Sequence, residues 1–281
     1  AAARIMAEEQ RHGWQMAYLL MTYFDQQGRR EAQKLLERNA QEGDRLLGAF
    51  NRPMTHWLDF FCYTMFVDRD GKFQLGMLST SAFKPLAASM GPMLKEEAFH
   101  LGTGSNGLRR VIKAGVLPLD LLQRYINQWV ATAHDLFGVD ESSSAHWAYV
   151  WGVKGRWDER KKLDADIEVS KEKLNEEARH HYHEEIVREV RKLCSYLPDD
   201  VPKLYVPHEN FNREIGPYKR QRYTVEGTKF DGTDDEWDEY VKNHLPTDQD
   251  EEDLKEYFKQ QWVAEKPMTA KQIASGIGAN A

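Results

Sequence analysis

Two short stretches of the chain each carry a glutamate and a histidine three residues apart. Glu9 and His12 form the first pair, and Glu97 and His100 form the second. Residues three apart share one face of an α-helix, so each pair would project a carboxylate and an imidazole together. Two such helices facing one another supply half of a metal site each, which is the recurring di-iron arrangement of four-helix bundles. The spacing therefore predicts a two-metal centre.

A further carboxylate between the two pairs fits the same centre. Asp68 falls on the apolar stripe of Phe61, Thr64 and Met65 in a predicted central helix. A carboxylate in apolar surroundings needs a cation or hydrogen bonds to offset its lost hydration, and a metal pair would supply that offset. The candidate metal ligands, which are also the candidate catalytic residues, are Glu9, His12, Asp68, Glu97 and His100.

The acidic residues next to these ligands are expected to do something else. Glu8 and Glu96 directly precede the two glutamate ligands and should point away from the metal face, and Asp70 is expected at a helix surface or a turn. A third copy of the pattern, Glu177 to His180, lies among charged residues and is interpreted as a surface coincidence. The alternative for the two main pairs is a buried charge network in which glutamate and histidine satisfy one another without metal.

The elements that must position these residues are helices. The apolar periodicity predicts one helix over residues 4–27, ended by Gly28, and another over residues 82–100, with Pro85 in its first turn. Pro92 is expected to kink or restart the latter helix. The glycine-rich stretch at residues 102–107 matches a nucleotide-binding pattern, but it follows a helix rather than a strand, so it is expected only to end the helix and turn the chain.

Two more helices follow from the same patterns. Pro53 and Thr55, with Thr55 as the N-cap, open a long helix that carries Asp68. Another helix begins at Pro118 and ends at Gly138. The predicted fold class is therefore all-α, a four-helix bundle with a more irregular C-terminal extension; the family resemblance given below makes this bundle ferritin-like.

The amino-acid composition changes near residue 155, after which charged residues become more frequent. Residues 1–155 are predicted to form the di-iron helical core, and residues 156–281 to form charged helices and an irregular C-terminal extension. Within that extension we expect a highly solvated helix or pair of helices over residues 161–193, a hairpin turning at Glu226-Gly227, and an acidic arm at residues 248–253. No carboxylate on an earlier helix precedes Glu9, so the first bundle helix and its ligand are expected upstream of Ala1.

Composition narrows the class of protein. The chain has 281 residues, 41% of them hydrophobic, a net charge of −7, and no Lys/Arg-rich tract that stands out, which argues against a nucleic-acid binder. Its two cysteines, Cys62 and Cys194, form no disulfide framework and suit the reducing cytosol, with Cys62 expected as a small core residue. The longest apolar runs are too short to span a bilayer.

A family resemblance extends this interpretation. The stretches LGAFNRPMTHWLDFFCYTMFVDRDGKFQL, SAFKPLAASMGPMLKEEAFH and VPHENFNREIG resemble the oxygenase components of benzoyl-CoA 2,3-epoxidases and, more distantly, the catalytic subunits of phenylacetyl-CoA epoxidases. The resemblance runs from about residue 7 to about residue 246 and is strongest over residues 47–104. Both Glu-x-x-His motifs and the intervening Asp68 occur in the family's order and near its spacing.

The resemblance implies a ferritin-like enzyme with two Fe ions and O2 as co-substrate. Such an enzyme inserts one oxygen atom into the aromatic ring of a CoA thioester of the benzoyl-CoA type, giving an epoxide. Glu9 and His12 would bind one iron, Glu97 and His100 the other, and Asp68 would be the carboxylate from a third helix. Electrons would come from a separate reductase with flavin and iron–sulfur centres, since two cysteines cannot hold a cluster here.

Several further expectations stay open at this point. The metals would be lined by Trp14, Phe61, Met65, Met93 and Phe99. The basic residues considered for the CoA phosphates are Lys84, Arg109, Arg110 and Lys113. The acidic C-terminal part could help to dock the reductase, and a homodimer or larger assembly is compatible with the family. The alternatives are a non-catalytic helical subunit of a larger assembly and a di-iron hydroxylase that acts on another acyl thioester.

Overall fold

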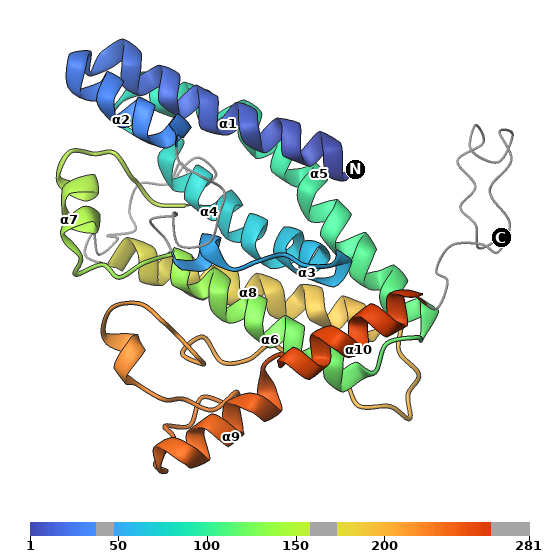
Figure 1. Ribbon diagram of the computed structural model, residues 1–281. Helices are drawn as coiled ribbons and strands as arrows, with labels where there is room; N and C mark the ends of the chain where they lie inside the picture. Colours follow the sequence, from blue (N-terminus) through green and yellow to red (C-terminus); the bar gives the residue numbers. More distant parts are fainter. Residues whose placement is uncertain (38–47, 158–172, 260–281) are drawn as a thin grey trace, which may run out of the picture.

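The computed structural model describes residues 1–37, 48–157 and 173–259. Within these ranges the regular structure is helical apart from one isolated β-bridge, so the predicted all-α class is confirmed (Figure 1). The elements in chain order are α1 (Ala2–Tyr23), α2 (Asp25–Glu37), η1 (Gly48–Asn51), α3 (Trp57–Cys62), η2 (Tyr63–Val67), α4 (Asp68–Leu78), α5 (Lys84–Ala114), α6 (Leu119–Leu136), α7 (Ser143–Val150), α8 (Leu174–Cys194), η4 (Gly216–Arg220), α9 (Asp234–His244) and α10 (Asp248–Lys259). None of the helices in the described ranges combines the length and the apolarity needed to cross a bilayer.

The centre of the molecule is a helical rod made of α3, η2 and α4, which follow one another without a break. Helices α5, α6 and α8 pack around this rod, and their buried apolar side chains form one cluster with those of the rod. Burial of these side chains supplies the main driving force for the fold. The rod begins at His56, whose Nδ1 atom accepts a hydrogen bond from the Asp59 amide, so the prediction of Thr55 as the N-cap is wrong.

Helix α8 belongs to this core. Its buried residues Ala178, Tyr182, Ile186 and Val190 recur at four-residue steps and form one apolar stripe. The prediction of a highly solvated helix is therefore wrong for α8. Only the outer face of this helix is charged, and its inner face is buried in the core. Residues 158–172 lie outside the described ranges. The division into two domains at residue 155 stays a prediction, although the core itself extends past that residue.

Helix α1 ends at Tyr23, and α2 begins two residues later, at Asp25, whose φ of 46° marks a sharp turn. Gly28 lies inside α2, so the prediction that it ends the first helix is wrong. Its hydrogen faces α1 so closely that a Cβ atom there would lie 2.0 Å from the carbonyl oxygen of Leu20. The glycine is needed for close contact between the two helices rather than for termination.

Helix α5 is a single helix of 31 residues that contains Pro92 and the entire glycine-rich stretch. The expected restart at Pro92 and the expected helix end at residues 102–107 are both wrong, whereas Pro85 lies in the first turn as predicted. Gly104 and Gly107 face the rod, where a Cβ atom would lie 2.4 Å from the Met65 amide nitrogen and 2.2 Å from the Phe61 ring, respectively. These glycines let α5 approach the rod closely.

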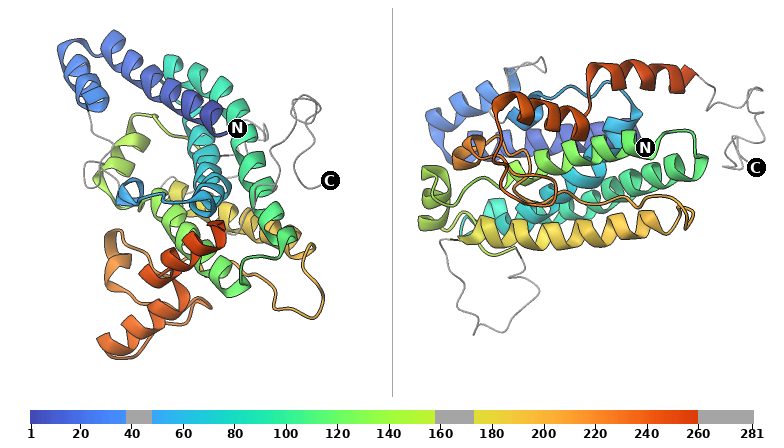
Figure 2. Two further views of the ribbon diagram at one scale, coloured as in Figure 1. Left: turned by 45° about the vertical axis from the view of Figure 1, so that its right-hand side comes forward. Right: turned by 90° about the horizontal axis from the view of Figure 1, so that it is seen from below.

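The C-terminal part is more irregular, as predicted, but its acidic segment is not a free arm. Asp250 in α10 is buried and pairs with Arg124 of α6 at 2.6 Å, and Leu254 is part of the core. The predicted hairpin is reduced to a turn at Gly227, whose φ is 90°, and the single bridge between Tyr223 and Lys229. Helix α9 lies at the opposite end of the molecule from α1 and α2 (Figure 2).

Candidate metal centre

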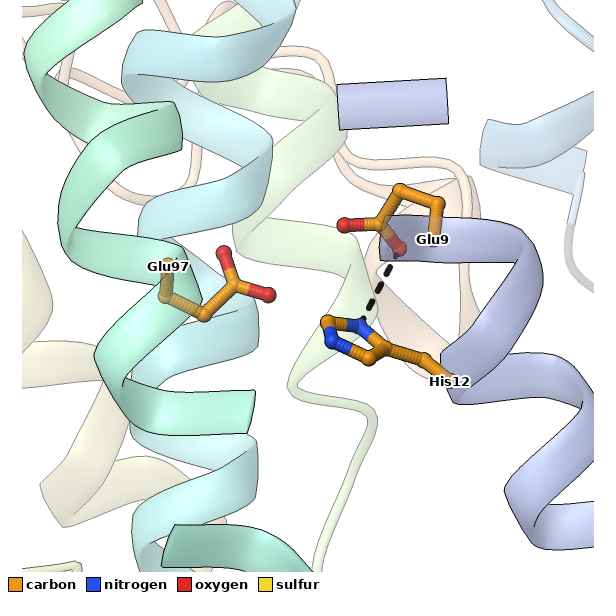
Figure 3. A group of neighbouring side chains, drawn as sticks. All are labelled: Glu9, His12 and Glu97. Carbon is orange, nitrogen blue, oxygen red and sulfur yellow. Dashed lines mark ion pairs between the residues drawn. The ribbon is translucent and has the colours of Figure 1, made fainter. Parts of the chain in front are cut away.

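The structure brings the five sequence-predicted residues together. Ligand atoms of Glu9, His12 and Glu97 lie within 4.8 Å of one another, and so do those of Asp68, Glu97 and His100. Figure 3 shows the Glu97 carboxylate pointing from α5 across the gap toward Glu9 and His12 on α1. Because Glu97 belongs to both groups, the arrangement has the form of two metal positions that share a carboxylate.

Three helices position these side chains. Each Glu-x-x-His pair projects from one face of its helix, as expected for residues three apart. Asp68 follows the wide π-helical turn η2, in which each hydrogen bond spans one more residue than in an α-helix. Thr64 supports this turn, since its hydroxyl donates to the carbonyl oxygens of Phe60 and Phe61 at 2.8 and 3.3 Å.

The buried half of the centre has three polar atoms that form no hydrogen bond with any of the described residues. Asp68 Oδ2, Glu97 Oε2 and His100 Nδ1 are buried without a hydrogen-bond partner among the described residues. Burial and the facing carboxylates raise the pKa of Asp68 well above its ordinary range, and burial also raises the pKa of Glu97. Buried polar groups are normally satisfied. A cation between these three atoms would satisfy them, and the mixed carboxylate and imidazole donors suit iron.

The two histidines turn their Nδ1 atoms toward the carboxylates. His100 Nδ1 lies 3.1 Å from Glu9 Oε1, 3.5 Å from Glu97 Oε2 and 3.8 Å from Asp68 Oδ2. Burial alone would lower the pKa of His100, but the surrounding glutamate carboxylates, Glu9 first among them, raise it to about 11. Burial alone would raise the pKa of Glu9, but the nearby imidazoles of His100 and His12 lower it to about 2. Metal binding would release these imidazole protons, because only neutral imidazole is a ligand.

Each histidine is held from behind by a glutamate of the opposite helix. Glu96 of α5 binds the outer nitrogen of His12 at 2.7 Å, and Glu8 of α1 binds the outer nitrogen of His100 at 3.0 Å. These two glutamates do lie off the ligand face, but sequence reasoning missed their contact with the histidines. Metal-binding histidines commonly donate their other N–H to a carboxylate. The glutamate that directly precedes each glutamate ligand could therefore have been predicted to bind a histidine.

Two arginines hold these supporting glutamates. Arg4 donates to Glu8 at 2.8 Å, and Arg11 donates to Glu96 at 2.5 Å. The bond from Arg4 lowers the pKa of Glu8; burial opposes the shift of Glu96, whose bonds from Arg11 and His12 lower its pKa. Both glutamates are thereby kept as anions that accept from the imidazoles.

The centre is enclosed on one side and open on the other. The Glu97 side chain is 6% exposed, whereas that of Glu9 is 48% exposed, so the interpretation of both pairs as buried holds only for the second. Among the residues predicted to line the metals, Met65 and Met93 are buried, and Phe61 and Phe99 are partly buried; their place beside the metals stays a prediction. Trp14 is 51% exposed on the outer face of α1, so its assignment to an enclosed lining is wrong.

Three other sequence expectations can be checked nearby. Asp70 is buried and accepts a hydrogen bond from Gln74 at 3.1 Å, so its placement at a surface or turn is wrong, and burial raises its pKa to about 7. The His180 side chain is 61% exposed, as expected for a surface coincidence. Cys62 is a fully buried core residue, as predicted, and burial raises the pKa of its thiol.

Comparison with known proteins places the chain in a family. A family model described as "Phenylacetic acid catabolic protein" matches residues 2–217, which include all five candidate ligands. The chain belongs to this family. The benzoyl-CoA oxygenase component B of Aromatoleum evansii is 34% identical over 88% of this chain, and the chain spans 61% of that relative's length. Membership confirms the resemblance inferred from the motifs and the all-α, ferritin-like fold.

Proposed function

We propose that this chain forms the metal-binding part of a di-iron monooxygenase that inserts one oxygen atom of O2 into the aromatic ring of a CoA thioester of the benzoyl-CoA type. The observation that carries the proposal is the pair of ligand groups joined at Glu97, in which three buried ligand atoms form no hydrogen bond with the described residues. The name of the relative, a benzoyl-CoA oxygenase component, supports the reaction and the substrate class.

The residues present fit two irons. Glu9 and His12 with Glu97 would hold one ion, and Asp68 and His100 with Glu97 would hold the other. Two adjacent irons, once reduced, would supply the activation of O2 that no side chain provides. Mixed oxygen and nitrogen ligands suit this chemistry better than thiolates do, and neither cysteine, Cys62 or Cys194, belongs to either ligand group.

The chain's own side chains would orient the ligands and exclude water. Glu8 and Glu96 fix the two imidazoles so that both Nδ1 atoms face the centre. The buried methionines Met65 and Met93 keep the inner side apolar, which favours an arene over water. The carboxylates and imidazoles that share protons in the absence of metal would exchange those protons for cations.

The residues of this chain cannot supply the electrons that the proposed reaction needs. The two cysteines of the chain, Cys62 and Cys194, are too few for an iron–sulfur cluster. We therefore propose a separate reductase with flavin and iron–sulfur centres as partner. We also propose a cytoplasmic location and assembly as a homodimer or larger complex.

The half-exposed Glu9 favours a second candidate function. A centre that is open at one ligand could bind metal without turning over substrate, as a helical subunit of a larger assembly would. A hydroxylase for another acyl thioester would share the ligands and differ only in substrate.

The test is metal content followed by turnover. The full-length protein that contains this chain should bind about two irons per chain, and with O2 and a reductase it should convert benzoyl-CoA to an epoxide. Glu97→Ala should keep the fold and lose iron, whereas Glu177→Gln, which alters the surface copy of the motif, should keep both irons. Iron-free protein with an intact fold would refute the proposal. Full loading without oxidation of any thioester in a panel would favour the non-catalytic alternative.

A further inference from the structure

A buried tryptophan of α6 is connected through one tyrosine to the turn that carries a metal ligand. Trp129 is 1% exposed, and its ring packs edge-to-face against Tyr63 of η2, with 5.6 Å between the ring centroids and an interplanar angle of 83°. Tyr63 lies one π-helical turn before Asp68, and its carbonyl oxygen accepts a hydrogen bond from the Asp68 amide. The two aromatic rings therefore form a contact path from the rod beside the metal centre to the core of α6.

The side chain of Tyr63 also borders the metal centre. Burial contributes most to the strong rise in its pKa, and the charges of Asp68, Glu9 and Glu97 raise this pKa further. Such an influence requires carboxylates close to the phenol, because the Coulomb energy between charges falls with distance. Tyr63 is therefore a neighbour of both the metal ligands and Trp129.

The indole N–H of Trp129 donates to a buried carboxylate. The distance from Trp129 Nε1 to Asp59 Oδ1 is 2.9 Å, and the Asp59 side chain is 4% exposed. The other oxygen of Asp59, Oδ2, accepts from the amide and the hydroxyl of Thr55 at 3.1 and 3.3 Å and lies 3.3 Å from His56 Nε2. Burial lowers the pKa of His56 despite the nearby acidic groups, so this imidazole is neutral near pH 7. Within the described ranges, the donors around Asp59 are thus neutral groups.

A carboxylate without a neighbouring cation favours the loss of an electron from the indole that it contacts. Indole is among the side chains most readily oxidised by one electron, and the oxidised ring carries a positive charge and an acidic N–H. The Asp59 carboxylate would stabilise that charge by Coulomb attraction, and its Oδ1 atom is in place to accept the proton. Core packing accounts for the edge-to-face ring pair, but it does not call for a buried charge beside the indole, because such a charge is costly to desolvate.

We propose that Trp129 is a one-electron donor to the metal centre, connected to it through the ring of Tyr63. The inference rests on the iron pair of the proposed function. When O2 has oxidised the iron pair and no arene is bound, one electron passes from the indole to the iron pair, and the indole proton passes to Asp59 Oδ1. The iron pair is thereby reduced by one electron, and Trp129 is left as a neutral radical. An external one-electron donor, such as ascorbate or the reductase, then restores the indole, and Asp59 returns the proton.

The first arm of the test uses the iron-loaded, full-length protein. The reduced protein is mixed with O2 without thioester, frozen rapidly and measured by electron paramagnetic resonance. We expect an organic radical whose spectrum narrows when the protein contains ring-deuterated tryptophan, which identifies an indole without any substitution. Trp129→Phe should lose this signal, and Trp147→Phe, at an exposed tryptophan, should keep it. A wild type without an organic radical, or a radical that survives in Trp129→Phe, overturns the proposal.

The second arm needs no metal. A near-ultraviolet laser flash on the metal-free protein, with persulfate as electron acceptor, oxidises its tryptophans, and the visible spectrum distinguishes the neutral indole radical from the protonated one. The signal that Trp129→Phe removes should be that of a neutral radical in the wild type and of a protonated radical in Asp59→Asn, whose amide is a poor base. Tyr182→Phe is the control, because this buried hydroxyl donates to the Phe66 carbonyl oxygen instead, and it should behave as the wild type does. The same form of the radical with Asp59 and with asparagine would overturn the proposal, and urea unfolding checks that each variant is folded.

The outcomes separate this proposal from the proposed function. A folded protein that binds no iron refutes both, because the electron from Trp129 then has no acceptor. A protein that binds two irons and forms the epoxide, but gives no Trp129 radical, refutes only the electron donor. A Trp129 radical in iron-loaded protein that oxidises no thioester supports the electron donor and refutes only the oxygenase function.

Discussion

Replacing Gly104 with alanine is expected to push apart the two elements that carry the buried half of the metal centre. The added Cβ atom would lie 2.4 Å from the Met65 amide nitrogen and 2.7 Å from the Thr64 hydroxyl. Ordinary contact begins at 3.4 Å, so α5 and η2 must separate by about 1 Å. Because the obstacle includes backbone, no side-chain rotation relieves it. Such overpacking costs about 1–3 kcal/mol, and the gain in helix propensity returns only about 1 kcal/mol.

The expected net effect is a loss of up to about 2 kcal/mol in the free energy of unfolding. Gly102→Ala is the matched control, because its Cβ atom would meet nothing within 4 Å, and it should leave stability unchanged or raise it. Urea unfolding measures both variants. Iron binding should also weaken in the Gly104 variant, since Asp68 directly follows η2. Equal stability and equal iron loading in the two variants would refute this account of the glycine-rich stretch.

Three further predictions address the metal centre and the core. Glu96→Gln should weaken iron binding about 10- to 100-fold, because the His12 ring loses its charged acceptor; metal titration against the wild type measures this, and unchanged affinity would contradict it. Removing iron with a chelator should lower the thermal unfolding midpoint of the wild type but not of Glu97→Ala. Burial lowers the pKa of His134 well below 6.5. The unfolded chain therefore takes up a proton that the folded chain does not, so stability present above about pH 6.5 is lost as the pH falls, by up to about 1.4 kcal/mol per pH unit. Urea unfolding at several pH values should show a shallower dependence for His134→Gln and an unchanged one for the exposed His180→Gln.

The candidate ligands could be predicted from the sequence because their signal is local. A glutamate and a histidine three residues apart lie on the same face of a helix, and this does not depend on the rest of the chain. The positions of Glu9 and Glu97 relative to each other also followed from the assumption that two like motifs face one another. Their unequal exposure did not, since it depends on which elements cover α1.

The errors arose where long-range packing overrides local preference. Glycines in the 102–107 stretch look like a helix end, yet they lie within α5 because the rod approaches too closely for a side chain at Gly104. The charged residues of α8 hid a stripe with a period of four residues. The wide turn η2 has no composition that distinguishes it from the adjoining helices, so the π-helical segment before Asp68 was not predictable, although Asp68 itself was.

The reciprocal support of the histidines has a consequence for motion. Each imidazole is steadied by a glutamate from the other helix, and the main contacts of α1 within the described ranges are with α2 and α5. Two ions bound across this seam would act as a clip between segments about 90 residues apart, and such clips close long loops effectively. The opening of α1 and the escape of metal would then be one event, visible as amide hydrogen exchange in α1 that slows when iron is bound.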